Sequence, residues 1–201
     1  DWYHRHQRIL PWRSQPTPYR VWVSEIMLQQ TQVATVLPYF DRFLSQFPNL
    51  QALAAADLES VLKCWEGLGY YSRARNFHKA ARLLVETQNG RIPGTFEALQ
   101  ELPGIGPYTA AAIASIAFGQ PVPVVDGNVL RVFCRFWEIA EPVATGKPAK
   151  TIFARLQGEI ERHRPGDFNQ ALMELGALVC APKTPACGKC PLGDDCAARR
   201  T

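Results

Sequence analysis

Four cysteines near the C-terminus constrain the fold of this chain more than any other feature. They follow the pattern Cys180-x6-Cys187-x2-Cys190-x5-Cys196, which places four thiols within 17 residues. Four soft sulfur ligands at such short spacing select either a tetrahedral zinc ion or an iron–sulfur cluster, and the spacing does not distinguish the two. A pair of disulfides is the third interpretation, although nothing else in the sequence indicates an oxidising compartment. We therefore expect the tail to fold around a metal centre.

The rest of the chain is patterned for helices rather than strands. Apolar residues recur at helical spacing between turns marked by Gly and Pro, so we predict an all-α protein. Asp57 and Thr95 are the expected N-caps. The remaining cysteines, Cys64 and Cys134, lie in apolar helical surroundings that are typical of buried free thiols. The predicted helices cover residues 24–47, with a break near Pro38, and then 57–64, 71–89, 95–101, 108–118, 128–137, 147–163 and 168–179.

Composition is compatible with a polyanionic partner but does not require one. The chain has 22 Lys and Arg against 18 Asp and Glu, a formal net charge of +4, and many soluble enzymes carry as much. The sequence has no run approaching about 18 apolar residues and no signal-peptide pattern at its start. We therefore expect an intracellular protein without a membrane segment, in the cytoplasm or nucleoid if the source is bacterial. Because the sequence opens on Asp1 without Met, the natural protein is expected to extend further.

A glycine-containing turn separates two of the predicted helices. It reads Leu102-Pro103-Gly104-Ile105-Gly106-Pro107, directly before the helix that begins near Tyr108. The glycines permit backbone amides to turn outward, and together with the positive end of the helix these amides form an anion site that holds a phosphate without reading a base. A tight helix–helix turn with a glycine C-cap explains the same residues equally well.

Two carboxylates are candidates for catalysis. Glu25 lies among apolar residues of a predicted helix; alone it would be a solvated position, but its neighbours favour burial, which raises a carboxyl pKa and allows proton delivery near neutral pH. Asp126 follows an apolar run and precedes a helix, where a lone Asp is most often an N-cap. Breaking an N-glycosidic bond needs an acid for the departing base and a carboxylate for the oxocarbenium-like sugar. Glu25 and Asp126 suit those two roles.

These segments together resemble the MutY-type adenine DNA glycosylases, within the wider endonuclease III superfamily. The resemblance implies a helix-hairpin-helix glycosylase fold with the active site in a cleft between two domains. A six-helix domain would cover residues 18–121, with the hairpin at about 99–118, and a [4Fe–4S] cluster domain would comprise 1–17 and 122–201, with its cluster loop at 180–196. The matching segments, which span almost the whole chain, are residues 10–13, 22–33, 65–76, the glycine turn, 125–129 and the four cysteines.

The resemblance also implies roles for individual residues. Glu25 matches the residue that protonates adenine N7 and later activates water, and Asp126 matches the carboxylate that stabilises the sugar cation. Gln30 and Tyr70 match side chains that wedge into the base stack while adenine is flipped out. Tyr108 and Asn128 match active-site neighbours. The further expected DNA contacts are Arg8, Arg13, Leu28, Gly104 and Gly106, and the expected cluster ligands are Cys180, Cys187, Cys190 and Cys196.

The expected partner is double-stranded DNA that contains adenine opposite 8-oxoguanine or guanine, bound by a monomer. Two rivals lie within the superfamily. Endonuclease III-like lyases carry a nucleophilic Lys where this chain has Tyr108, so a Schiff base lacks its amine. Thymine or uracil mismatch glycosylases lack the acid that Glu25 supplies. A non-catalytic DNA-binding module is the rival from another class, and retention of both carboxylates disfavours it. We expect a monofunctional enzyme, its catalytic part without the family's C-terminal domain that reads 8-oxoguanine.

Overall fold

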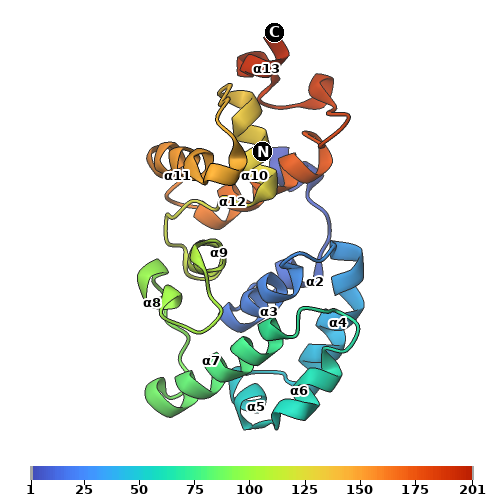
Figure 1. The fold of residues 1–201 in the computed structure, drawn as a ribbon, viewed down its shortest axis with the longest axis vertical. Coiled ribbons are helices and arrows are strands. Elements are labelled where there is room, and N and C mark those ends of the chain that lie inside the picture. The colour runs from blue at the N-terminus through green and yellow to red at the C-terminus, as the bar shows by residue number, and fades with distance from the viewer. Residues whose placement is uncertain (1, 201) are drawn as a thin grey trace. The chain divides into compact units, whose positions relative to one another are not determined.

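The computed structural model describes residues 2–200, and all the regular elements in that range are helices (Figure 1). The all-α prediction is therefore confirmed. The chain forms two compact units. One unit is the continuous segment Ile9–Phe118, and the other joins the N-terminal residues through Arg8 to the residues from Gly119 on. None of the helices within residues 2–200 combines the length and the apolar character needed to cross a membrane.

The unit Ile9–Phe118 is built around buried aromatic side chains. Trp22 contacts Phe77 with ring centroids 4.7 Å apart, and Phe43 meets Trp65 edge-on at 5.9 Å. These four side chains are almost completely buried and bring α3 (Pro18–Leu28), α4 (Val33–Gln46) and α7 (Ser72–Gln88) onto one core. The helices of this unit are α2 (Pro11–Ser14), α3 (Pro18–Leu28), α4 (Val33–Gln46), α5 (Leu50–Ala55), α6 (Leu58–Cys64), α7 (Ser72–Gln88), α8 (Phe96–Gln100) and α9 (Pro107–Phe118).

The helix predicted over residues 24–47 is wrong in both its start and its break. It is two helices, α3 and α4, and the chain turns at residues 29–32, where Gln30 has a φ of 55°. Pro38 lies inside α4, where it removes one backbone donor but leaves the helix intact because Phe40 and Phe43 are fully buried in the core. The helix α5 was not predicted at all. The N-caps were predicted correctly: Asp57 accepts from the Ser60 amide at 2.8 Å, and Thr95 accepts from the Ala98 amide at 3.3 Å.

The other unit, named the C-terminal unit because most of its residues follow Phe118, contains the four-cysteine tail. Its hydrophobic core is formed by α10 (Gly127–Phe136), α11 (Lys147–Glu159) and α12 (Pro165–Leu178), and Val129, Ile152 and Leu156 are among its most buried members. Its α-helices are α1 (Trp2–His6), α10 (Gly127–Phe136), α11 (Lys147–Glu159), α12 (Pro165–Leu178) and α13 (Ala197–Arg200), with short 3-10 helices at η1 (Val143–Thr145), η2 (Cys187–Lys189) and η3 (Gly193–Asp195).

The boundary between the units differs from the expected one. Residues 9–17, expected with the cluster domain, fall in the unit Ile9–Phe118, where Leu10 and Trp12 are buried in the core. Trp12 packs edge-on against Phe40 at 5.3 Å, and Arg20 donates to the Pro11 carbonyl at 3.0 Å. Only the residues through Arg8 join the C-terminal unit, where the Arg8 guanidinium donates to both carboxylate oxygens of the fully buried Glu174 at 2.9 and 2.8 Å.

Candidate active site

A buried carboxyl is held between α3 and α9. Glu25 lies on α3 and is only 5% exposed, so its predicted burial is confirmed. The hydroxyl of Tyr108, in the first turn of α9, donates to Oε2 of Glu25 at 2.8 Å. A second bond, from the Gln29 side-chain amide to the Thr109 hydroxyl at 3.1 Å, ties the end of α3 to the start of α9. Two helices far apart in the sequence therefore fix the position of one acidic group.

The predicted helix-hairpin-helix is present at α8 and α9 (Figure 1). Gly104 has a φ of 81°, and a Cβ there would lie 2.6 Å from Cβ of Asn76 on α7. Only glycine satisfies both the left-handed backbone and this close approach. The Ile105 amide donates to the Leu102 carbonyl at 3.1 Å, and Gly106 is exposed just before α9 begins. The turn is thus tight, as expected for a simple connection between two helices. It also leaves the start of α9 accessible, as a phosphate site requires.

Gln30 and Tyr70, the two expected wedge residues, lie in separate loops. Both are exposed, Tyr70 by 59%, and both have a left-handed backbone, with φ of 55° and 48°. No role was assigned to Arg73 from the sequence. Arg73 is only 8% exposed and lies on the buried face of α7 with Phe77 and Leu84. Its spacing of four residues from Phe77 was the available signal.

In the C-terminal unit, Asp126 is the N-cap of α10. Its Oδ1 accepts from the Val129 amide and its Oδ2 accepts from the Asn128 side-chain amide, both at 2.7 Å. The N-cap interpretation is confirmed, and the half-buried carboxylate is also fixed by Asn128. Asn169 on α12, which sequence reasoning missed, is fully buried and bonds the backbone before Asp126 by accepting from the Val124 amide at 3.0 Å and donating to the Val122 carbonyl at 2.9 Å.

Arg131 connects the start of α10 to the cysteine tail. It donates to Oδ1 of Asn128 at 2.8 Å, to the Gly176 carbonyl at 2.8 Å and to the Cys180 carbonyl at 2.8 Å. α10 and α12 also approach closely here, since a Cβ on Gly176 would lie 2.5 Å from Cβ of Asn128. Asp126, Asn128 and the first cysteine of the tail thus belong to one hydrogen-bonded structure.

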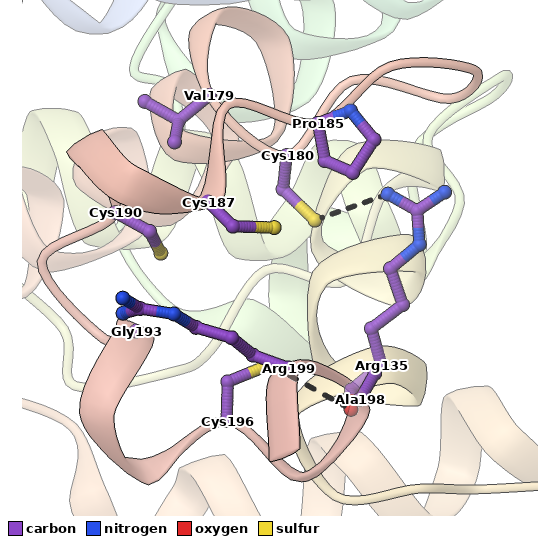
Figure 2. A pocket seen from close by; sticks show the side chains of 10 residues that line it. All are labelled: Arg135, Val179, Cys180, Pro185, Cys187, Cys190, Gly193, Cys196, Ala198 and Arg199. Atoms are coloured by element: carbon purple, nitrogen blue, oxygen red, sulfur yellow. Dashed lines mark hydrogen bonds between the residues drawn. The ribbon is translucent and has the colours of Figure 1, made fainter. Parts of the chain in front are cut away.

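The four cysteines of the tail surround one cavity (Figure 2). The cavity measures about 210 Å³, and Arg135 and Arg199 contribute to its wall. Arg135 donates to Sγ of Cys180 at 3.3 Å and to the carbonyls of Ala181 and Pro182 at 2.8 and 2.7 Å. Burial raises the pKa of the Cys190 thiol, and the charges of the other three cysteines raise it further. The four thiols and the two arginines therefore line the same cavity.

This donor set fits a group bound by four thiolates. All four cysteines carry free thiols, and the two arginines supply positive charge beside them. Within residues 2–200, no three His, Cys, Asp or Glu side chains already converge on a single ion position. Cys64 is buried, as predicted, and Cys134 is half-buried. The DNA contact predicted for Arg8 stays a prediction; in the structure its guanidinium donates to the buried Glu174.

The chain belongs to the HhH-GPD superfamily of base excision DNA repair proteins. The sequence profile of that superfamily matches residues 23–175, a span that contains Glu25, the hairpin and Asp126. The chain is 50% identical over 209 residues to the adenine DNA glycosylase of Homo sapiens, covering 100% of this chain and 38% of the relative. It is 43% identical over 199 residues to the adenine DNA glycosylase of Buchnera aphidicola subsp. Schizaphis graminum, covering 98% and 57%. The chain thus spans about half the length of these relatives or less.

Solved structures of proteins that act on DNA have the same fold. A thermostable thymine-DNA glycosylase superposes with a TM-score of 0.89 at 27% identity, covering 99% of this chain and 92% of that one. A trapped endonuclease III–DNA covalent intermediate superposes with a TM-score of 0.81 at 24% identity, covering 99% and 91%. The expected helix-hairpin-helix glycosylase fold is confirmed.

Proposed function

We propose that this chain is the catalytic part of an adenine DNA glycosylase that removes adenine paired with 8-oxoguanine or guanine in double-stranded DNA. The observation that carries this proposal is the buried Glu25, hydrogen-bonded to Tyr108. Adenine is a poor leaving group until it is protonated, so excision needs an acid whose proton is retained near neutral pH. The 40–52% identity to adenine DNA glycosylases supports the same assignment.

Each polar group has a defined task in this proposal. Glu25 protonates the departing adenine and afterwards takes a proton from the attacking water, while Tyr108 orients its carboxyl group. Asp126 stabilises the oxocarbenium-like sugar, held in orientation by Asn128 and the Val129 amide. Because Tyr108 offers a hydroxyl in place of an amine, no Schiff base forms at this position. The reaction therefore leaves an intact abasic strand, and the enzyme is monofunctional.

DNA binding is assigned to surfaces of the unit Ile9–Phe118. The hairpin at Gly104 and Gly106 holds a backbone phosphate at the start of α9. Gln30 and Tyr70 enter the base stack, beside Leu28 at the end of α3, and Arg13 adds a phosphate contact.

The four thiolates of the tail bind a [4Fe–4S] cluster in the proposed protein. Bound there, the cluster supplies folding free energy to a tail that has little apolar core of its own. Arg135 donates to the Cys180 sulfur and so partly neutralises the thiolate charge at the first ligand.

The test uses a duplex with one A:8-oxoguanine or A:G pair, followed by heating in alkali. We expect strand cleavage at the adenine only after alkali, and no cleavage of a matched A:T duplex. Glu25→Gln keeps the shape of the side chain but cannot donate the proton, so single-turnover excision should fall by more than about 100-fold while DNA binding persists. Glu59→Gln, an exposed change on α6, is the matched control. Near-normal excision by folded Glu25→Gln would overturn the assignment of the acid.

A thymine mismatch glycosylase is the second candidate, favoured by the structural likeness at a TM-score of 0.89. A T:G duplex in the same assay distinguishes the two substrates. Excision of thymine but not adenine would replace the proposed function with this one.

A further inference from the structure

The buried guanidinium of Arg73 donates to five backbone carbonyls. Its Nη1 donates to the carbonyls of Ile26, Met27 and Gln29 at 2.9, 2.9 and 2.6 Å. Its Nη2 donates to the carbonyls of Leu68 and Gly69 at 3.2 and 3.1 Å. The three carbonyls bound by Nη1 lie at the C-terminal end of α3, where the last carbonyls lack helical partners. The two carbonyls bound by Nη2 lie in the loop before α7.

Aromatic rings complete the environment of Arg73. Its guanidinium carbon lies 5.4 Å from the ring centroid of Trp65 and 5.4 Å from that of Tyr70. Burial lowers the pKa of Arg73, which reflects the cost of removing this charge from water. The planar fork satisfies carbonyls on two sides at once, and a lysine ammonium, which is a single point of donation, does not reproduce that geometry.

Two of these carbonyls adjoin the wedge residues. The Gln29 carbonyl is part of the peptide plane that includes the Gln30 nitrogen, and the Gly69 carbonyl is part of the plane that includes the Tyr70 nitrogen. Holding both planes restricts the backbone at Gln30 and Tyr70, which have φ of 55° and 48°. Left-handed backbone is costly for residues with a Cβ and persists only when the surroundings enforce it. One side chain thus acts on both loops.

We propose that Arg73 is a positioning residue that holds Gln30 and Tyr70 in one preorganised wedge before DNA binds. This inference rests on the wedge role given to these two residues in the proposed function. Arg73 touches neither the base nor the sugar in this proposal. Its effect is on the fraction of molecules whose two loops are ready to enter the base stack, and the rate of base flipping scales with that fraction.

The first measurement follows backbone order without DNA. Hydrogen exchange is compared between the wild type, Arg73→Lys and the control Arg82→Lys, a conservative change at an exposed position on the same helix. We expect Arg73→Lys to accelerate exchange in residues 28–31 and 68–71 together, by about tenfold or more, while α9 is unchanged. Unchanged exchange in either segment overturns the proposal, and so does acceleration throughout the unit, because Arg73 would then only support the fold.

The second measurement follows base unstacking. A 2-aminopurine placed beside the mispaired adenine reports unstacking in a Glu25→Gln background, in which the base is not excised. Adding Arg73→Lys should slow unstacking by about tenfold, while affinity for a matched duplex changes by less than about threefold, because the hairpin contacts remain. Tyr70→Ala in the same background is the reference and should slow unstacking similarly.

The outcomes separate this inference from the proposed function. If Tyr70→Ala slows unstacking and Arg73→Lys does not, the inference fails alone. If neither does, the wedge role itself is wrong and the inference falls with it. Should Arg73→Lys fail to fold, Arg73→Gln, which keeps a planar donor, is measured in the same two ways. Failure of both variants to fold makes Arg73 a general determinant of stability and overturns the proposal.

Discussion

Replacing Gly176 by alanine should disturb the start of α10 more than the overall stability of the protein. Gly176 lies inside α12, and the added Cβ would meet Cβ of Asn128 at 2.5 Å and the Asn128 backbone at 3.0 Å. Ordinary contact begins near 3.4 Å, so the α10 residue must retreat by roughly 0.9 Å. Because two of the three close atoms are backbone, a rotamer change does not relieve the clash.

The magnitude follows from two opposing terms. Alanine in place of a helical glycine is favourable by about 0.5–1 kcal/mol, whereas overpacking a close helix contact costs about 1–3 kcal/mol. The expected net loss of unfolding free energy is therefore about 0–2.5 kcal/mol. The effect on chemistry should be larger, since Asn128 holds the Asp126 carboxylate at 2.7 Å. A displacement of about 1 Å near a reacting centre costs up to about 100-fold in rate.

Urea unfolding and single-turnover excision of an A:G duplex measure the two effects separately. Gly158→Ala is the matched control, because Gly158 is exposed on α11 and its Cβ would meet nothing within 4 Å. That control should be neutral or slightly stabilising and fully active. If Gly176→Ala matches this control in both measurements, the added Cβ does not displace Asn128 and the predicted clash is wrong. A loss of stability without any loss of rate would show that Asn128 does not orient Asp126 during the reaction.

Two further predictions concern the C-terminal unit. Arg8→Met removes the guanidinium bonds to the fully buried Glu174 and should lower the unfolding free energy, measured by urea unfolding, by roughly 3 kcal/mol. Adding Glu174→Leu to this variant should recover part of the lost stability. If it recovers none, the buried ion pair is not the cause of the loss. The purified protein should be brown, with broad visible absorbance and about four iron atoms per chain. Cys187→Ser should lose both the colour and the soluble yield. An active, colourless protein loaded with zinc would contradict the cluster assignment.

Periodicity and capping rules predicted most of the helices, and the failures have local causes. The break assigned to Pro38 was placed by a rule about isolated helices, yet burial of Phe40 and Phe43 outweighs one missing hydrogen bond. The real turn at residues 29–32 contains neither Gly nor Pro. Its left-handed Gln30 depends on carbonyl contacts with Arg73, more than forty residues away, so no local pattern contained that information.

The sequence predicted the carboxylates of the candidate site better than the side chains that orient them. The burial of Glu25 followed from its apolar neighbours, and the N-cap role of Asp126 followed from its position before a helix. The partners that orient them were not predictable from spacing alone. Tyr108 reaches Glu25 across 83 positions, and Asn169 reaches Val124 across 45. Such contacts are set by tertiary packing, which a single sequence does not state.

The unit that carries the cysteines is assembled from both ends of the chain, and this has a consequence for synthesis on the ribosome. The continuous unit Ile9–Phe118 has all of its residues once Phe118 has emerged, so it can fold while translation continues. The other unit cannot complete its fold until α12 has emerged, because Arg8 binds Glu174 on that helix. The nascent chain therefore carries Arg8 without its Glu174 partner until α12 emerges, and the four cysteines of the tail emerge only after that.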